Sequence, residues 1–519
     1  MISPLLNELD LVALAILFLS LTILWHKLTS NVSQNEKHRL PPGPRGLPIV
    51  GFLPFLRPSL HYQLTELSQK YGPIYKLWLG SRLFIVLNSP SLAKEVFCDQ
   101  DTVFANRDPS IAAFVASYGG LDIVFSPYGS YWRDMRKLFV REMLSNRNLE
   151  ASYSHRKHEI RKAIRSVHTK IGSQIDISEL AFVTEINVIM SIIFGSNFGD
   201  EMEKHGKIGR DFRELVVKIP EMSEEPNISD FFPILARFDL QGIKNSTEAL
   251  IKSFDCILDP VLNERMKMIS EGQIRRSRNK DFSQILLELM EQKETQISVD
   301  LVKIKAILID LVIGGTDTTT TMVEWVMAEL LNNSDKMAKV QQELKHVIGL
   351  NHIVEESHLP KLHYLDAVIK ETLRLHPAFP MLQRICPSQS TIVGGYTVPQ
   401  DTKVILNVYA IHRDPQVWEN PLEFQPERFL MSQSTNNLNY SGNNYKYLPF
   451  GSGRRSCAGV ALADKMLMFM EASFLHSFDW QLPEGEKVDL SDGNGFVIKK
   501  KTPLFAIPTP RLPNLELYQ

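Results

Sequence analysis

The 519-residue chain has few cysteines and almost no net charge. Its four cysteines, Cys98, Cys256, Cys386 and Cys457, include no CxxC or CxxH pair, so the sequence predicts neither a disulfide framework nor a structural zinc site. The formal net charge of −2 leaves no basic excess for nucleic-acid phosphates, which excludes a dedicated nucleic-acid-binding protein. Such low cysteine usage suits a reducing, cytosol-facing environment better than an extracellular one.

The sequence also lacks internal repeats, Gly/Ser-rich boundaries and low-complexity segments. Its hydrophobic content of 44% and charged content of 22% are typical of globular proteins, so we expect a large buried core. No Gly-x-Gly-x-x-Gly motif follows a predicted strand and opens a helix, so the chain shows no site of its own for NADPH or a flavin. Any electrons that it uses must come from another protein.

The N-terminal region contains an uncharged apolar run over residues 11–25, which as a helix would be about 22 Å long. No Lys or Arg precedes the run, whereas Lys27, Lys37 and Arg39 follow it. A secretory signal peptide would need a basic start and a small-residue cleavage site, and neither is present. The positive-inside rule therefore predicts a single-pass anchor with a lumenal N-terminus and a cytosolic body, in a thin bilayer such as that of the endoplasmic reticulum.

Three regions follow from this pattern. We expect residues 1–28 to form the membrane anchor, residues 29–50 to form a basic, proline-rich hinge and residues 51–519 to form one large domain. The hinge contains LPPGPRGLP at residues 40–48, and its prolines fix φ and favour an extended, stiff backbone.

The body is expected to be mainly α-helical with a small sheet. Apolar spacing of the i, i+3, i+4 kind predicts helices over residues 57–72, 130–170, 178–195, 245–270, 281–293, 301–348, 360–375 and 458–476. Short alternating runs predict strands over residues 74–79, 83–87, 391–393 and 404–408.

One cysteine has a distinctive context. Residues 449–459 read PFGSGRRSCAG and precede an amphipathic run, which places Cys457 at the start of a long helix. There the helix dipole is expected to lower the thiol pKa and favour a metal-binding thiolate; the alternative is an inert buried cysteine. The spacing FxxGxRxCxG has a chance occurrence of about 3 in 100,000 at any of the cysteines, which favours a ligand; it is formed by Phe450, Gly453, Arg455, Cys457 and Gly459.

With this motif, the anchor and the proline-rich hinge, the sequence resembles the cytochrome P450 superfamily of haem-thiolate monooxygenases, plant microsomal type, over essentially its whole length. The resemblance implies a helical, haem-enclosing domain with a small β-sheet region. It also implies that Cys457 is the axial ligand of the iron of haem b and that its thiolate favours O–O cleavage.

Two further motifs precede the cysteine. Glu371 and Arg374 lie on one helical face and could be an ordinary surface pair. The resemblance instead implies that they form the ExxR pair of the family, joined by Arg428 to lock the haem-side core. Residues 314–319, GGTDTT, interrupt an otherwise good helix, so the region forms either two helices, the second capped by Thr321, or one long helix opened at Gly314 and Gly315. In the second case Gly314, where the family usually has Ala, leaves room over the iron, and Asp317 and Thr318 resemble the acid–alcohol pair that delivers protons to oxygen.

Haem propionates need cations or strong donors. The resemblance implies this role for Trp132 and Arg136, which match WxxxR, and for Arg455 and Arg384. It also implies electrons from NADPH through a separate flavoprotein, the membrane-bound NADPH–cytochrome reductase, which would meet a basic patch formed by Arg133, Lys137, Lys446 and Arg454.

The expected substrate contacts are mostly apolar and carry no charge, so they predict a lipophilic substrate. They are Ile111, Phe114, Val115, Leu121, Ile123, Leu311, Gly314, Phe379, Met381, Leu382, Phe496 and Val497. The C-terminal stretches most resemble plant terpenoid hydroxylases, especially sesquiterpene oxidases, with flavonoid or phenylpropanoid hydroxylation as the alternative. A reductase-independent haem-thiolate isomerase or dehydratase and a non-catalytic haem sensor are further alternatives.

Overall fold

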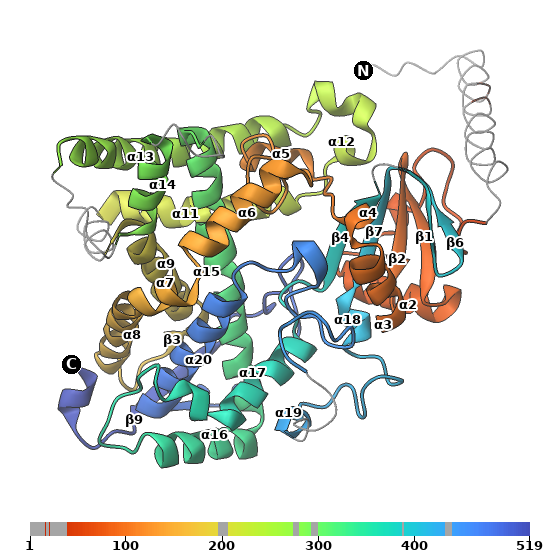
Figure 1. Ribbon diagram of the computed structural model, residues 1–519. Helices are drawn as coiled ribbons and strands as arrows, with labels where there is room; N and C mark the ends of the chain where they lie inside the picture. Colours follow the sequence, from red (N-terminus) through yellow and green to blue (C-terminus); the bar gives the residue numbers. More distant parts are fainter. Residues whose placement is uncertain are drawn as a thin grey trace, which may run out of the picture.

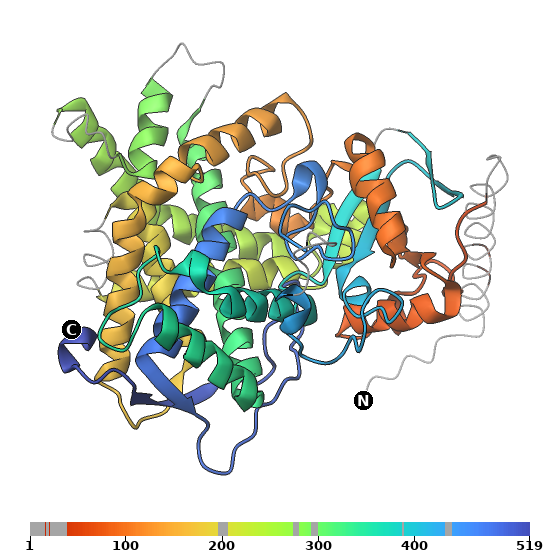
Figure 2. The same cartoon turned by 60° about the horizontal axis from the view of Figure 1, so that its bottom comes forward.

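The structure is a computed structural model, and it describes residues 16, 20, 39–195, 206–272, 280–291, 299–386, 389–430 and 438–519. A helix-rich part makes up most of the molecule, and a small mixed sheet lies to one side of it in both views (Figures 1 and 2). The expected membrane anchor, residues 1–28, lies outside the described residues except for Ile16 and Ser20.

The prediction of a mainly α-helical body with a small sheet is confirmed. The helices are α2 (Leu60–Tyr71), α3 (Pro90–Lys94), α4 (Asp101–Phe104), α5 (Ile111–Ala116), α6 (Ser130–Glu142), α7 (Asn146–Ala151), α8 (Tyr153–His168), α9 (Ile177–Phe194), α11 (Gly206–Glu224), α12 (Ile228–Phe231), α13 (Ile243–Ser270), α14 (Phe282–Glu291), α15 (Leu301–Asn332), α16 (Ser334–Val347), α17 (His363–Leu375), α18 (Val408–Ile411), α19 (Glu427–Leu430) and α20 (Val460–Ser477).

Helix α15 runs through the middle of the helical part, with α9 along one side and α20 beside it (Figure 1). Its N-terminus is capped by the Asp300 carboxylate, which accepts from Lys303 N at 2.9 Å. Residues Met322–Ala328 are all buried, so this half of the helix is the centre of the largest hydrophobic core. The central helix thus provides a rigid support for the side chains that project from its middle.

Two long predicted helices are shorter in the structure. The run 130–170 contains three helices, α6 to α8, and the run 301–348 breaks between α15 and α16 at Asn333. Asn333 leaves the helical conformation, and its side-chain amide donates to Glu329 O at 2.8 Å. Apolar spacing continues across both breaks, which is why periodicity alone did not show them.

The main sheet has the strand order β1-β2-β7-β4. Strands β1 (Ile74–Leu79) and β2 (Arg82–Leu87) form a hairpin, β7 (Thr402–Asn407) lies parallel to β2, and β4 (Met381–Cys386) lies antiparallel to β7. A second sheet has the order β3-β9-β8, and β5 pairs with β6; these strands are β3 (Ile175–Asp176), β5 (Thr391–Val393), β6 (Tyr396–Val398), β8 (Phe478–Gln481) and β9 (Phe505–Pro510). The four predicted strands are confirmed, whereas β3, β4, β6, β8 and β9 were not predicted.

The described end of the proline-rich hinge packs on strands β1 and β6. Lys76 N donates to Pro42 O at 2.8 Å, and Thr397 N donates to Arg39 O at 3.3 Å. Gly43 lies so close to β1 that a Cβ on it would be 2.1 Å from Lys76 O, so this position accepts glycine only. From residue 39 onward the segment is therefore part of the body and not a free connector.

Among the described residues, one helix is long and apolar enough to cross a membrane. It is α9, with a mean hydropathy of 1.7 in its 18-residue window. Because 67% of that window is buried inside the protein, mainly against α15 and α8, α9 is a core helix.

Candidate active site

Cys457 lies in a tight loop directly before α20. Its backbone N–H donates to Phe450 O at 2.9 Å, and its Sγ accepts from Gly459 N at 3.3 Å. The loop turns at Gly453, whose φ is +70° and whose Cβ, if present, would lie 2.5 Å from Phe97 O. Glycine is therefore required at residue 453 for the loop to reach this position.

The protonation of Cys457 differs from the sequence-based expectation. Desolvation by the surrounding protein raises the pKa of this thiol above its usual value, although the side chain keeps exposed surface, and the Gly459 and Val460 N–H groups and the Arg136 guanidinium oppose that effect only in part. For the protein alone, the lowered pKa expected from the helix start is therefore not found, because desolvation outweighs the N–H groups. A cation that binds the sulfur must therefore displace its proton.

The Glu371–Arg374 pair is completely buried, with both side chains 0% exposed, so it is not an ordinary surface pair. Arg374 Nε and Nη2 donate to the two Glu371 oxygens at 2.7 and 2.8 Å, a bidentate arrangement. Arg428 Nε donates to the same carboxylate at 3.0 Å, as the family resemblance implied. Arg374 Nη1 also donates to the carbonyls of His412 and Pro421, both at 2.7 Å, so the pair fastens the segment after β7 onto α17.

His412 connects that segment to the cysteine loop, a role that no sequence motif indicates. Its Nε2 accepts from Leu448 N at 2.9 Å, two residues before Phe450. Burial and the neighbouring Arg374 and Arg413 lower the pKa of His412 to about 3, so the ring is neutral and can accept this bond. A continuous set of bonds thus leads from Glu371 to the loop that holds Cys457.

The middle of α15 is one continuous helix, so the two-helix alternative is wrong. Thr321 Oγ1 donates to Asp317 O at 2.8 Å inside the helix and caps nothing. Gly314 borders open space, since a Cβ there would meet nothing within 4 Å, whereas a Cβ on Gly315 would lie 2.9 Å from Ile189 Cδ1 of α9. The first glycine therefore leaves room on the open side of the helix, and the second permits close packing against α9.

The two polar residues after these glycines have defined partners. Thr318 Oγ1 donates to Gly314 O at 2.8 Å, one turn back along α15. Asp317 Oδ1 lies 2.7 Å from Lys499 Nζ, which comes from the C-terminal turn. Glu224, near the end of α11, accepts from the N–H groups of Phe496 and Val497 in the same turn, and Lys499 stabilises its charge. Asp317 is thus linked through Lys499 to the C-terminal turn and to the end of α11.

A group of arginines lies in the interior beside the cysteine loop; its members are Arg107, Arg136, Arg384 and Arg455. Burial lowers the pKa of Arg384 well below its usual value, and Arg107 and Arg455 lower it further by repulsion. Burial also lowers the pKa of Arg455 to about 9 and that of Arg107 to about 10. In the described part of the chain, nothing accepts a hydrogen bond from Arg107 Nε. This excess of positive charge beside Cys457 fits a ligand with two carboxylates, such as haem.

All four expected propionate donors already donate to backbone carbonyls. Trp132 Nε1 donates to Ile123 O at 2.9 Å. Arg455 donates to the carbonyls of Ala105, Ile123 and Ser126 at 2.7, 3.2 and 2.6 Å. Arg136 Nη2 donates to Ser456 O at 2.7 Å, and Arg384 Nη1 to Gln383 O at 2.9 Å. Each guanidinium keeps further N–H groups for a ligand, so the arginines both build and face the site.

The segments expected to contact substrate meet around the middle of α15. Ile123 N donates to Asp310 of α15, Ile498 N donates to Ala378 O at 3.0 Å, and Leu382 lies against Gly451 of the cysteine loop. Helix α5, with Ile111, Phe114 and Val115, packs against α11 and α13. Phe114, Phe379 and Phe496 are 51%, 41% and 40% exposed, whereas Ile123, Leu311 and Val497 are buried in the core. The three rings thus keep accessible surface, as do the half-buried Ile111, Val115, Leu121, Met381 and Leu382.

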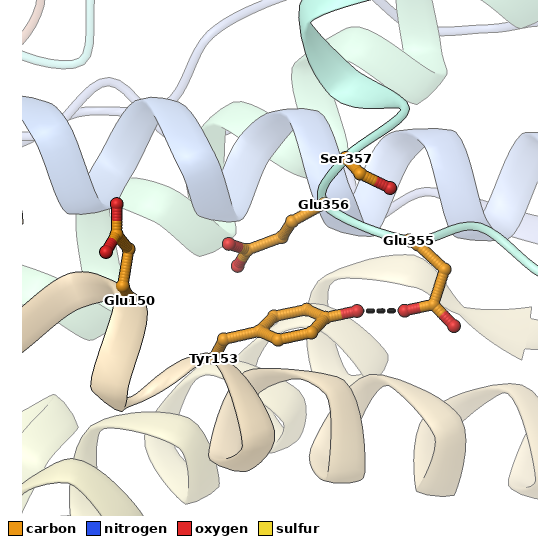
Figure 3. Close-up of a pocket in the computed structure, with 5 residues that line it drawn as sticks. All are labelled: Glu150, Tyr153, Glu355, Glu356 and Ser357. Atoms are coloured by element: carbon orange, nitrogen blue, oxygen red, sulfur yellow. Dashed lines mark hydrogen bonds between the residues drawn. The ribbon is translucent and has the colours of Figure 1, made fainter.

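A separate pocket of about 400 Å³ opens between the start of α8 and the loop after α16 (Figure 3). Tyr153 and Glu355 face each other across it and are hydrogen-bonded, and Glu150, Glu356 and Ser357 complete the lining. Arg156 and Lys157 pair with Glu356 and Glu355 at 2.6 Å, so these carboxylates are largely neutralised. None of the predicted site residues lines this pocket, so it is distinct from the Cys457 site.

Comparison with known proteins agrees with this arrangement. The cytochrome P450 family model matches residues 41–507. The chain is 35% identical to a sugiol synthase of Salvia miltiorrhiza over 92% of this chain and 96% of the relative. It is 37% identical to a flavonoid 3'-monooxygenase of Crocosmia x crocosmiiflora (91% and 93%) and 35% identical to a ferruginol synthase of Salvia miltiorrhiza (97% and 98%). The solved structure of a zebra fish cytochrome P450 with abiraterone is similar, with a TM-score of 0.72 and 25% identity, covering 88% of this chain and all of that one. The chain therefore belongs to the cytochrome P450 family and is a haem-thiolate monooxygenase.

Proposed function

We propose that this monooxygenase hydroxylates a lipophilic plant terpenoid in the cytosol-facing domain of an anchored protein. One observation supports the placement of haem most directly: Arg136, a member of the arginine group, donates to Ser456 O at 2.7 Å, directly before Cys457, so the thiol and the arginines lie at one site. A planar ligand that carries a metal ion at its centre and two carboxylates at its edge satisfies both features at once. Cys457 would then hold the iron, and Arg107, Arg136, Arg384 and Arg455 would hold the propionates.

The bound haem iron supplies the activation of oxygen, and the thiolate ligand favours O–O cleavage. The chain's own task is to bring protons to that oxygen and to exclude stray water. Thr318 Oγ1 can turn from Gly314 O toward the open side of α15, where Gly314 leaves space. Asp317 can then recharge the hydroxyl with protons through water, while Lys499 holds its carboxylate in place.

The apolar side chains available to a ligand support a terpenoid substrate. Phe114, Phe379 and Phe496 offer three partly exposed rings, and the predicted lining contains no charged group that could bind a carboxylate or phosphate. The sugiol and ferruginol synthases among the relatives act in terpenoid formation, which agrees with this choice. Flavonoid hydroxylation is the second candidate, because the flavonoid 3'-monooxygenase is as similar to this chain as the terpenoid enzymes are.

Membrane attachment and electron supply complete the proposal. Residues 1–28 would anchor the protein in the endoplasmic reticulum membrane, and NADPH–cytochrome reductase would deliver electrons to the cysteine side. Arg133 and Lys137 are exposed on α6, and Lys446 is exposed beside the cysteine loop. Arg454 contributes less than expected, since its guanidinium pairs with Asp101 at 2.7 Å.

The haem assignment is tested by the absorption spectrum of the reduced, carbon-monoxide-bound protein. The wild type and the control variant Cys98→Ala are expected to show the thiolate-ligated band, and Cys457→Ala is expected to lose it. Cys457→Ala that keeps the band would refute the assignment.

The substrate class is tested with microsomes that contain the protein and its reductase. Equal concentrations of terpenoids and flavonoids are supplied with NADPH, and the products are identified by mass. Oxygenated terpenoids as the main products support the proposal, and oxygenated flavonoids as the main products favour the second candidate. Turnover of a lipid hydroperoxide without NADPH or reductase would replace both with an isomerase.

A further inference from the structure

Two acidic side chains meet beside the proposed substrate chamber. Asp122 lies in the loop before α6 and is only 1% exposed. Asp310 lies on α15, one turn before Gly314, and its Oδ2 accepts from the N–H of Ile123, the residue after Asp122, so the two carboxyl groups are neighbours and each acts on the pKa of the other. Two carboxylates in contact inside a protein cannot both be ionised without strong repulsion, so one of them must carry a proton to donate.

Together the two carboxyl groups bind three backbone N–H groups of one short segment. Ile123 N donates to Asp310 Oδ2 at 2.6 Å. Phe125 N and Ser126 N donate to Asp122 Oδ1 at 2.9 and 3.0 Å. Three of the four amides of residues 123–126 thus depend on this pair.

The carbonyl groups of the same segment are held from the opposite side. Tyr131 Oη donates to Leu121 O at 2.7 Å, and Trp132 Nε1 donates to Ile123 O at 2.9 Å. Arg455 donates to Ile123 O and Ser126 O. Segment 121–126 is therefore fixed between α15 and the two residues expected to face the haem propionates.

We propose that Asp310 and Asp122 share a single proton, which Asp310 donates to the Asp122 carboxylate, and that this pair positions segment 121–126 as one wall of the substrate chamber. Both are positioning residues. They act on substrate through Leu121, and on the haem side through Ile123 O, which accepts from both Trp132 and Arg455. The effect of this pair on turnover rests on the monooxygenase function proposed above. The shared proton and the position of segment 121–126 are independent of that function.

The charged groups around Asp122 and Asp310 are consistent with one proton shared by the two carboxyl groups. Burial and the Asp122 charge raise the pKa of Asp310 well above its usual value. Burial raises the pKa of Asp122 to about 6, against the N–H groups of Phe125 and Ser126 and the Arg455 charge. The other groups that act on the pair are Arg107 and Tyr131, and Tyr131 is neutral because burial and nearby carboxylates raise its pKa. Near neutral pH the pair therefore carries one negative charge, which faces Arg107 and Arg455.

The shared proton is tested by infrared spectroscopy of the purified holoenzyme at pH 7.5. Asp310→Asn is expected to remove the C=O stretch of one protonated carboxyl group. Glu471→Gln is the matched control, since Glu471 is also fully buried, with burial raising its pKa well above the usual value, but it has no bond to segment 121–126. An Asp310→Asn spectrum that loses no protonated-carboxyl band would overturn the proposal.

The held segment is tested by amide hydrogen exchange over residues 123–126 in the same samples. Asp310→Asn keeps a donor toward Asp122 and an acceptor for Ile123, so exchange is expected to stay within about threefold of wild type. Asp310→Leu loses both, so exchange should rise about tenfold or more in this segment alone. Glu471→Gln should leave the segment unchanged. If Asp310→Leu does not fold, the test uses the pH dependence of amide exchange at alkaline pH, corrected for the intrinsic exchange rate. In wild type the corrected rate should rise when Asp310 loses its proton, and in Asp310→Asn it should stay constant.

Equal loss of protection in Asp310→Asn and Asp310→Leu would overturn the proposal, as would identical pH profiles for wild type and Asp310→Asn. None of these readouts needs turnover. The carbon-monoxide spectrum, recorded on the same samples, reports separately on the thiolate assignment, so failure of the pair and failure of the proposed function are distinguishable.

Discussion

Lys499 Nζ lies 2.7 Å from Asp317 Oδ1 and joins the C-terminal turn to the middle of α15. Asp317 is mostly buried, with 13% of its side chain exposed, whereas Lys499 keeps 44% exposed. The lysine comes from a segment 182 positions away in the sequence, and Glu224 of α11 acts on the same ammonium group. The proposed proton-delivery acid is therefore held by a residue that also responds to the end of α11.

Replacing Lys499 should impair proton delivery more than substrate binding. In Lys499→Gln the Asp317 carboxylate loses the ammonium group that orients it, so less of the NADPH consumed should yield product, by roughly three- to tenfold. Lys499→Arg should restore most of the coupling, because it retains the charge. The measurement is the ratio of product formed to NADPH oxidised, with KM for comparison. Normal coupling in Lys499→Gln would show that the ion pair has no role in the reaction.

Breaking the buried Glu371–Arg374 pair should strongly destabilise the protein. Glu371→Gln leaves the Arg374 and Arg428 guanidinium groups without their shared carboxylate, at a cost of about 3–5 kcal/mol in the free energy of unfolding. The matched control lies on the same helix: Asp366 pairs with Lys370 at 2.6 Å, but with 36% and 19% exposed it should contribute less than about 1 kcal/mol. Chemical unfolding of Glu371→Gln and Asp366→Asn measures the loss in the free energy of unfolding for each variant. A loss in Glu371→Gln as small as that in Asp366→Asn would contradict the structural role given to Glu371.

The sequence was sufficient for features that depend on local spacing. The period of the apolar residues predicted the long helices, and the loop motif put Cys457 directly before α20. Features that depend on distant contacts were missed. Arg107, His412 and Lys499 acquire their partners only when segments far apart in the chain meet, and nothing in their neighbourhoods marks them. The direction of the Cys457 pKa has the same origin, since desolvation by the surrounding protein depends on the fold and not on the motif.

The arginine group should affect haem-free and haem-containing protein in opposite directions. Arg384→Gln removes one of several mutually repelling buried cations, so the haem-free protein should unfold at a higher temperature. The same variant loses a proposed propionate partner, so haem should dissociate about threefold faster or more. Thermal unfolding and the rate of haem transfer to an acceptor globin measure the two effects. Arg454→Gln is the control, because Arg454 is exposed and already paired with Asp101; equal haem loss in both variants would argue against a specific role of Arg384.

Charge reversal on α6 should weaken the interaction with reductase. Lys137→Glu places a negative charge in the exposed face that is proposed to meet an acidic partner, so the reductase concentration for half-maximal turnover should rise about three- to tenfold at low salt. The difference should shrink as salt increases, because exposed charges are screened. Lys345→Glu on α16 is the matched control, since Lys345 is equally exposed but lies away from α6 (Figure 1). A salt-independent effect, or the same effect in both variants, would contradict an electrostatic interface at α6.

Acid should destabilise the protein through His412. The pKa of this ring falls from an ordinary value near 6.5 to about 3 on folding, so between these pH values the unfolded chain binds the extra proton. The contribution of His412 is therefore fully present above pH 6.5 and decreases as the pH falls toward 3, by at most about 1.4 kcal/mol per pH unit. Asp122 and Asp464, whose pKa values rise to about 6, act in the opposite direction, but they are common to wild type and variant.

The comparison between wild type and His412→Gln isolates this contribution. A glutamine has no charge at any pH, and its side-chain oxygen can still accept from Leu448 N. We expect the melting temperature of wild type to fall more steeply than that of His412→Gln from pH 7 to pH 5, with the two curves parallel above pH 7. Parallel curves over the whole range would mean that His412 takes up its proton in the folded protein, and that the bond from Leu448 to the ring does not hold the cysteine loop.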